Sequence, residues 1–263
     1  MNISIAIPIL LGWIAALLVN YLSDVLPATR KLSSPTCQHC AAKFTWIDYL
    51  LLKGCSSCGK PRGWRTWLTQ LFGIAISLYI WFAPPNKLGY WLGLALLVYL
   101  AVVLIIDLEH RLILHPVSVV GAVLAAALGI FLHGLFPTLI GGIAGYGIMY
   151  LFYAFGILFT KMRAKRMQAQ GIEADDEEAL GFGDVNLAGI LGLLLGWPII
   201  WFGLLLGILG GGAISLLLMV FVLIKQRYQD NALMIFIPYG PYFILSAFVL
   251  LYLPHWITPI LES

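Results

Sequence analysis

Charge is scarce in this chain. Only 10% of its 263 residues are Asp, Glu, Lys or Arg, whereas 61% are hydrophobic. Soluble domains average about 25% charged and about 45–50% apolar residues, so the composition excludes an ordinary soluble domain. It also excludes a disordered chain, which would be poor in apolar residues. The formal net charge of +3 is too small to indicate nucleic acid as a partner. A mean hydropathy of +0.95 instead predicts a polytopic membrane protein that contacts the lipid bilayer.

Long apolar runs divide the chain. A membrane-spanning helix needs about 20 apolar residues, and the composition leaves room for about eight such helices. The first run, 3–22, lacks a basic N-terminal region and a small-residue cleavage site, so we expect a retained span rather than a signal peptide. After a polar stretch, the other runs cover residues 67–83, 88–106, 117–133, 138–160, 185–197, 199–224 and 234–254. The run 185–197 is short for a full crossing; we expect a tight hairpin after it, with a re-entrant pair as the alternative.

Basic residues are confined to alternate loops. With eight spans, fourteen of the fifteen Lys and Arg residues fall on one side, and only Lys87 falls in another loop. Because basic loops stay in the cytosol, we expect a cytoplasmic (inner) membrane protein with both termini outside. The predicted parts are a first transmembrane helix at 1–22, a cytosolic loop at 23–66, and a transmembrane core at 67–263. That core includes a cytosolic loop at 161–183.

All four cysteines lie in the first cytosolic loop. They form two C-x2-C pairs, Cys37 with Cys40 and Cys55 with Cys58, separated by fourteen residues. Two such pairs can place four thiolates around one zinc ion at about 2.3 Å. The alternatives are two disulfides or four unligated thiols, but a reducing cytosol disfavours disulfides. We therefore expect a zinc knuckle whose role is structural, because a small loop cannot bury a core of its own.

Two aspartates lie at the edges of apolar runs. Asp107 ends the run 88–106, and Asp184 opens the run 185–197 within the stretch Gly181-Phe182-Gly183-Asp184. The predicted topology places both at the cytosolic edge of the membrane, where two carboxylates could share a proton and activate water. Gly181 and Gly183 would let a peptide backbone approach closely, unless they are ordinary loop glycines. The alternatives are a helix N-cap for Asp184 and a solvated corner for Asp107, with Arg111 as its partner.

These motifs resemble those of the type IV prepilin leader peptidases, a family of Gly-x-Gly-Asp intramembrane aspartyl proteases. The stretch 106–111, Ile-Asp-Leu-Glu-His-Arg, is similar to the family's Ile-Asp-Leu-(Glu/Asp)-His pattern. The stretch 181–187 approaches Gly-x-Gly-Asp-Val-Lys-Leu, with Asn186 in place of Lys. The late Ile-Pro-Tyr-Gly-Pro at 237–241 is similar to the family's Ile-Pro-Phe-Gly-Pro, and the paired cysteines and Asn20 with Pro27 are similar to features of its bacterial branch. The resemblance covers nearly the whole chain.

The resemblance implies a peptidase that removes the short basic leader from prepilins or pseudopilins of type IV pili and type II secretion. Asp107 and Asp184 would be its catalytic dyad, with Gly181 and Gly183 in a supporting active-site loop. Bacterial members also methylate the new N-terminus with S-adenosylmethionine, and this resemblance identifies no residues that bind that cofactor. Here the stretch 63–70 lacks the acidic residue that the family carries. The alternatives are therefore a peptidase alone, with a structural zinc loop, or a proton-coupled transporter.

Helix dipoles predict different roles for the two acids. A helix N-terminus stabilises negative charge, whereas a C-terminus disfavours it. We therefore expect Asp184 to act as the base toward water and Asp107 to carry the shared proton.

Overall fold

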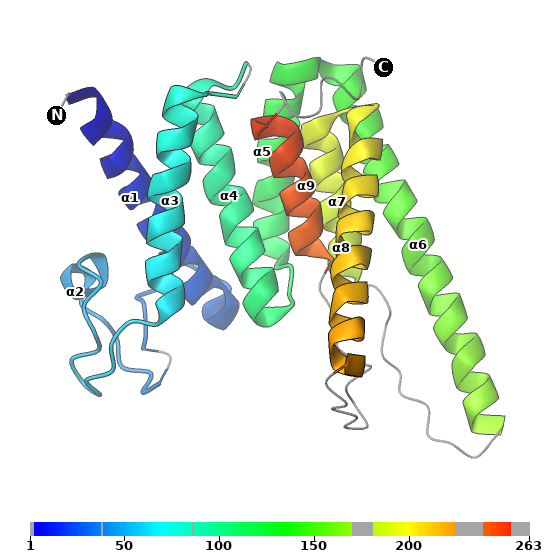
Figure 1. Ribbon diagram of the computed structural model, residues 1–263, viewed down its shortest axis with the longest axis horizontal. Helices are drawn as coiled ribbons and strands as arrows, with labels where there is room; N and C mark the ends of the chain where they lie inside the picture. Colours follow the sequence, from blue (N-terminus) through cyan, green and yellow to red (C-terminus); the bar gives the residue numbers. More distant parts are fainter. Residues whose placement is uncertain (1–2, 38, 86, 170–180, 225–238, 254–263) are drawn as a thin grey trace. The chain divides into compact units, whose positions relative to one another are not determined.

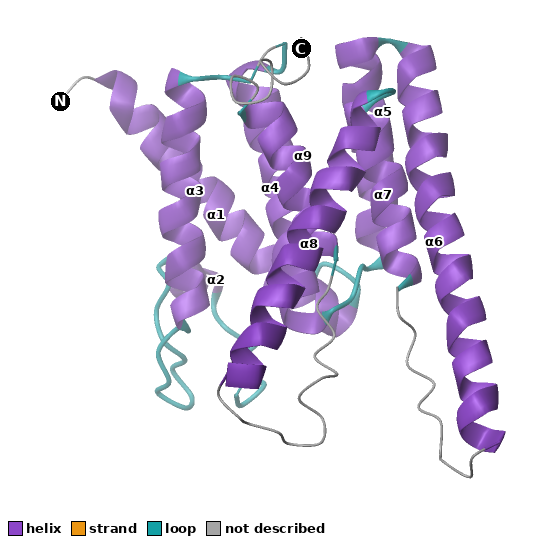
Figure 2. Cartoon of the chain, turned by 45° about the vertical axis from the view of Figure 1, so that its right-hand side comes forward, coloured by secondary structure: helices purple, strands orange, loops and turns teal. Residues whose placement is uncertain are grey.

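The protein is described by a computed structural model in which residues 3–37, 39–85, 87–169, 181–224 and 239–253 are placed. This part of the chain is helical and contains an isolated bridge between Thr36 and Lys43 but no strand (Figure 2). The predicted all-α class is confirmed. The acidic half of the 161–183 loop and the Ile-Pro pair at 237–238 fall outside the described residues.

The described residues form nine helices (Figure 1). They are α1 (Ile3–Thr29), α2 (Trp46–Leu50), α3 (Trp64–Phe82), α4 (Gly89–His110), α5 (His115–His133), α6 (Leu135–Ala169), α7 (Phe182–Leu195), α8 (Ile199–Ile224) and α9 (Gly240–Tyr252). Each predicted apolar run corresponds to one helix, and the short α2 inside the cysteine loop is additional. Two helices extend well beyond their apolar runs. The helix α1 continues past residue 22 to Thr29, and α6 continues past residue 160 to Ala169.

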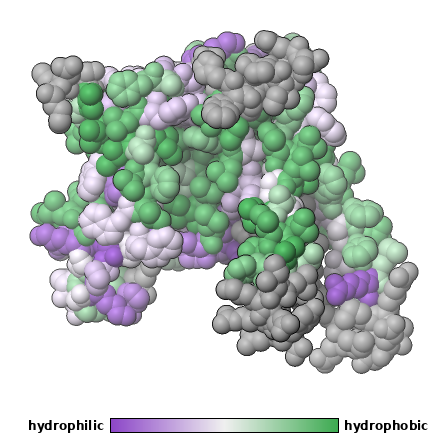
Figure 3. Space-filling model, viewed as in Figure 1, coloured by the Kyte–Doolittle hydropathy of each residue, from purple (hydrophilic) through white to green (hydrophobic). Residues whose placement is uncertain are grey.

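Five described helices are long and apolar enough to cross a membrane: α1, α4, α5, α6 and α8. The helices α7 and α9 are apolar but shorter, so the number of eight spans stays a prediction. Large apolar side chains are exposed along the helices, as the green surface in Figure 3 shows. Examples are Leu10, Phe72, Val123, Ile143, Leu151 and Leu217. A lipid environment accounts for this exposure, because apolar residues facing lipid lose nothing by leaving the protein core.

The chain divides into two compact units, residues 1–116 with 251–263 and residues 117–250. In the first unit α1 packs closely against α3, because glycines bring their backbones together. A Cβ on Gly12 would lie 2.7 Å from the Cβ of Ser77, and one on Gly73 would lie 2.7 Å from the Cβ of Ala16. The cysteine loop connects these two helices, and α4 packs against both.

In the second unit, α7 packs against α6 through a column of glycines. A Cβ on Gly145 would collide with the carbonyl oxygen of Ala188, and one on Gly192 would collide with the carbonyl oxygen of Gly141. Most of α7 is buried, which fixes the helix that carries Asp184. A three-residue turn, 196–198, then connects α7 to α8. Its first residue, Gly196, has φ of 71°, a conformation that favours glycine. The predicted tight connection is therefore present.

Candidate active site and metal site

Asp107 lies in the last turn of α4. It is buried, with 4% of its surface exposed, and its Oδ2 has no hydrogen-bond partner among the described residues. The helix continues to His110 and ends where Arg111 adopts a left-handed conformation and donates its backbone N–H to the Asp107 carbonyl at 2.9 Å. The solvated-corner interpretation of Asp107 is therefore wrong. A buried carboxylate oxygen without a partner is costly and is typical of a functional group.

Asp184 lies in the first turn of α7. The N-cap of this helix is Gly181, whose carbonyl accepts the Asp184 backbone N–H at 3.0 Å. The N-cap interpretation of Asp184 is therefore wrong, although the carboxylate still lies near the positive end of the helix dipole. A Cβ on Gly181 would lie 3.8 Å from Asp184 Oδ2, so this glycine leaves the space beside the carboxylate open. Gly183 is the second residue of the same turn.

The two aspartates belong to different compact units, Asp107 to the first and Asp184 to the second. The pairing of these two carboxylates stays a prediction.

The four cysteines gather into one cluster, and all four sulfur atoms lie within 4.8 Å of one another. The Sγ atoms are 3.8 Å apart between Cys37 and Cys58 and 3.6 Å apart between Cys40 and Cys55. Four thiolates at about 2.3 Å from a tetrahedral zinc would be about 3.8 Å from one another. A disulfide requires about 2.0 Å, and all four cysteines are free. The cluster therefore has the donor set and the spacing of a metal site rather than of two disulfides.

Each cysteine pair is held in a tight turn. Ala41 donates its backbone N–H to the Cys37 carbonyl at 2.9 Å, and Gly59 donates to the Cys55 carbonyl at 2.8 Å. The backbone N–H groups of Cys58 and Ser57 lower the pKa of the Cys55 thiol to about 6. Because the thiolate is the form that binds metal, this turn prepares Cys55 as a ligand at neutral pH.

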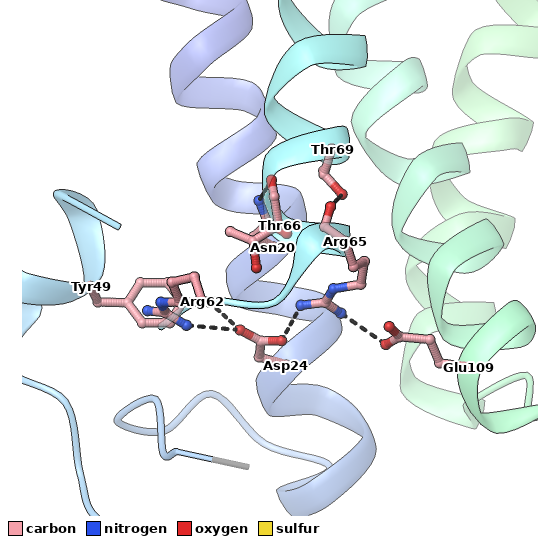
Figure 4. A network of polar contacts seen from close by, with 8 residues as sticks. All are labelled: Asn20, Asp24, Tyr49, Arg62, Arg65, Thr66, Thr69 and Glu109. Atoms are coloured by element: carbon pink, nitrogen blue, oxygen red, sulfur yellow. Dashed lines mark hydrogen bonds and ion pairs between the residues drawn. The ribbon is translucent and has the colours of Figure 1, made fainter. Parts of the chain in front are cut away.

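The cysteine loop is attached to the helices by a polar network around Asp24 of α1 (Figure 4). Asp24 accepts a hydrogen bond from the Tyr49 hydroxyl at 2.6 Å, pairs with Arg62 at 3.7 Å, and pairs closely with Arg65. Arg65 also donates to Glu109 of α4 at 2.8 Å. Burial, together with the Asp24 charge, raises the pKa of Tyr49 well above its ordinary value of 10, so the phenol stays neutral and donates its proton to the hydrogen bond.

A pocket of about 260 Å³ lies between the cysteine cluster and this network. Its charged lining is of both signs: Asp24, Glu109, Lys60, Arg62 and Arg65. The Arg62 guanidinium lies over both the Phe44 and the Tyr49 ring, at 4.3 and 4.1 Å from their centroids. Neither this pocket nor the network around Asp24 was predicted from the sequence.

The apolar helices indicate a polytopic membrane protein, and its four clustered cysteines could hold a metal ion. Comparison with known proteins shows which family the chain resembles. Residues 94–216, which include both aspartates, match the type IV leader peptidase family. The resemblance predicted from the sequence is therefore confirmed for this segment.

Several curated relatives have the name prepilin leader peptidase/N-methyltransferase, and three of them illustrate the similarity. The protein of Aeromonas hydrophila is 27% identical over 239 residues, covering 87% of this chain and 74% of its own length. That of Aeromonas salmonicida (strain A449) is 27% identical, covering 82% and 69%. That of Burkholderia pseudomallei (strain 1026b) is 29% identical, covering 83% and 67%. No solved structure matches the chain.

Proposed function

We propose that this protein is an intramembrane aspartyl endopeptidase that removes the basic leader from prepilins or pseudopilins, with Asp107 and Asp184 as its catalytic dyad. The observation that carries the proposal is the burial of Asp107, with an unpartnered oxygen, in the last turn of a membrane-capable helix. This helix end lies in the segment that matches the leader peptidase family. The names of the curated relatives support the same substrate class.

The positions of the two acids suggest a different catalytic role for each. Asp184, in the first turn of α7, is the base that takes a proton from the attacking water, because a helix N-terminus favours the ionised form. Asp107, in the last turn of α4, carries the shared proton and donates it toward the scissile carbonyl oxygen. The tetrahedral intermediate then collapses as the leaving amine receives a proton from the dyad. Gly181 leaves room for the substrate backbone beside Asp184.

The proposed membrane arrangement is compatible with such a substrate. The dyad lies at the cytosolic boundary of the inner membrane, the cysteine loop lies in the cytosol, and both termini lie outside. The first proposed part, a transmembrane segment at 1–22, ends inside α1, whose helix continues to Thr29. A cytosolic segment at 23–66 and a peptidase core at 67–263 follow it. A prepilin keeps its basic leader in the cytosol and its apolar stem in the bilayer, so the bond between them reaches the depth of the dyad.

A reconstitution experiment separates this proposal from the transporter alternative. Purified protein in lipid vesicles is given a prepilin, and separately a pH gradient. We expect cleavage of the prepilin and no dissipation of the gradient beyond that of empty vesicles. Proton flux that Asp107→Asn abolishes, without cleavage by the parent protein, would favour the transporter.

The four cysteines are proposed to hold one structural zinc ion. Four thiolates complete a tetrahedral shell and leave no position for substrate, so the metal would stabilise the loop rather than take part in cleavage. The sulfur spacing and the turns around Cys37 and Cys55 support this assignment.

A second proposed activity is N-methylation of the new N-terminus, supported by the names of the relatives and by the pocket beside the cysteine cluster. S-adenosylmethionine, when bound, supplies a methyl group. The carboxylate of its amino-acid part would pair with Lys60 and Arg62. Its positively charged groups would pair with Glu109. Binding of radiolabelled S-adenosylmethionine, compared between the parent protein and Lys60→Glu, tests the site. No binding to the parent protein would favour a peptidase with a structural metal loop.

A further inference from the structure

We infer that Arg65 is a positioning residue for the peptidase site, acting through Glu109 on the turn of α4 that carries Asp107. This inference rests on the proposed catalytic role of Asp107. It assigns a function in cleavage to the ion-pair network of Asp24, Arg65 and Glu109, and neither proposed catalytic acid is a member of this network.

The Arg65 guanidinium connects three helices in the first unit. Arg65 is the second residue of α3, donates from Nη1 to Glu109 Oε2 at 2.8 Å, and pairs through Nη2 with Asp24 Oδ1 of α1 (Figure 4). The side chain of Arg65 is 19% exposed and that of Asp24 is 8% exposed. A planar guanidinium presents its donors in a fixed fork, so contacts on both sides of it determine the distance between α1 and the end of α4.

The anchor on α1 is itself restrained. Asp24 receives the Tyr49 hydroxyl and the Arg62 guanidinium as well as Arg65. Exposed ion pairs contribute little, because solvent screens them and long side chains lose entropy. A shielded pair with several partners restricts motion far more, so Arg65 holds Glu109 from a fixed position.

The other end of the network is Glu109, which lies in the last turn of α4. Glu109 follows Asp107 by two positions, which at about 100° per residue places it about 200° around the helix axis. The Arg65–Glu109 ion pair therefore restrains the side of the turn opposite to Asp107 and does not involve the Asp107 carboxylate. Last turns fray because their carbonyls lack intrahelical partners. A shift of about 1 Å at a catalytic group can lower the rate about 100-fold, so restraint of this turn matters for cleavage.

A double-mutant cycle tests the inference with Glu109→Gln, Arg65→Gln and the double variant. Prepilin cleavage is measured as kcat and KM per folded molecule. We expect each single variant to lower kcat by about 10-fold or more with a smaller change in KM. The double variant should be no slower than Arg65→Gln, because both changes remove the same restraint. The matched control is Lys53→Gln, which breaks the exposed pair of Lys53 with Asp48 and should leave kcat unchanged.

Hydrogen exchange supplies a readout that does not depend on activity. Backbone amides at 107–111 should exchange about 10-fold faster in Glu109→Gln than in the parent protein or in Lys53→Gln, since loss of the tie lets the turn open. A global loss of stability would instead accelerate exchange throughout the first unit. If Arg65→Gln does not fold, the kinetics and exchange of Glu109→Gln alone test the inference. The Glu109 side chain is 35% exposed, so an amide is tolerated there.

The outcomes are distinguishable. Cleavage by Glu109→Gln at the parent rate with unchanged exchange, or additive effects of the two substitutions, would overturn the positioning role. If Asp107→Asn is inactive in the same assay, only this inference has failed. If Asp107→Asn cleaves normally, the proposed dyad itself has failed.

Discussion

Tyr49 of the cysteine loop donates a hydrogen bond to Asp24 of α1, with 2.6 Å between the hydroxyl oxygen and Oδ2. The same carboxylate pairs with Arg62, which follows the second cysteine pair, and with Arg65 at the start of α3. The loop is therefore fastened to α1 in its middle, through Tyr49, and near its C-terminal end, through Arg62. A metal in the cysteine cluster and the Asp24 carboxylate of α1 would thus stabilise one structure together.

Tyr49→Phe removes this hydrogen bond and keeps the ring that covers Arg62. Hydrogen bonds to charged groups contribute about 1.5–3 kcal/mol, and Asp24 keeps two arginine partners, so we expect a loss near the lower end. Thermal unfolding in detergent measures it. Tyr21→Phe, which removes a bond to the neutral carbonyl of Ser33, is the control and should cost less. Equal losses for the two variants would show that the hydrogen bond to Asp24 stabilises the fold no more than a hydrogen bond to a neutral carbonyl.

The same bond predicts a dependence on alkaline pH. Burial and the Asp24 charge raise the pKa of Tyr49 above its ordinary value of 10, so the fold favours the neutral phenol. Its contribution to stability is complete below pH 10 and is lost as the pH rises beyond that value. Protease resistance of the loop, followed from pH 9 upward, should fall more steeply in the parent protein than in Tyr49→Phe. Parallel curves would contradict the prediction.

Metal content tests the cysteine cluster. Protein purified under reducing conditions from zinc-replete cells should contain one zinc ion per chain by elemental mass spectrometry. Cys37→Ser and Cys55→Ser remove buried ligands and should reduce zinc to about a tenth or less, with faster proteolysis of the loop. Ser57→Ala lies between the second pair and should retain the metal. Zinc-free parent protein, or full occupancy in the cysteine variants, would exclude the site.

Two glycines of α6 form a matched pair that tests the packing of the helix carrying Asp184. A Cβ on Gly145 would collide with the Ala188 carbonyl of α7, whereas one on Gly147 would meet nothing within 4 Å. We expect Gly145→Ala to destabilise the protein by about 1–3 kcal/mol through overpacking and to slow cleavage, because α7 must shift. Gly147→Ala should be neutral or slightly stabilising in a helix. Unfolding and cleavage are compared in the two variants, and similar behaviour would refute the close packing.

Much of the helical architecture could be predicted, because apolar runs near the length of a membrane span leave few alternatives to helices. The error at the end of the first run has a physical cause. A charge at residue 24 suggested the end of a span, but α1 continues to Thr29 because Asp24 is paired with Arg62 and Arg65 inside the fold. Hydropathy alone cannot detect such compensation.

The cysteine cluster was predictable because its spacing is local. The network of Asp24, Arg65 and Glu109 was not, because its members lie 41 and 44 residues apart and meet only when α1, α3 and α4 pack. One signal was present in the sequence: each of the three helices has charged residues only near its predicted cytosolic end, Asp24 in α1, Arg65 in α3, and Asp107 with Glu109 in α4. For Asp107 and Asp184 the catalytic role stays a prediction. The structure excludes two local alternatives, the cap and the corner, which depend on where the helices begin and end.

The most direct test of the central claim is mass spectrometry of a prepilin co-expressed with the parent protein, Asp107→Asn or Asp184→Asn. The account predicts a mature pilin without its leader in the parent strain and uncut prepilin with either variant, both of them expressed and inserted in the membrane. A further mass of one methyl group on the mature N-terminus would add the second activity. Leader removal by either variant at the parent rate would contradict the aspartyl dyad.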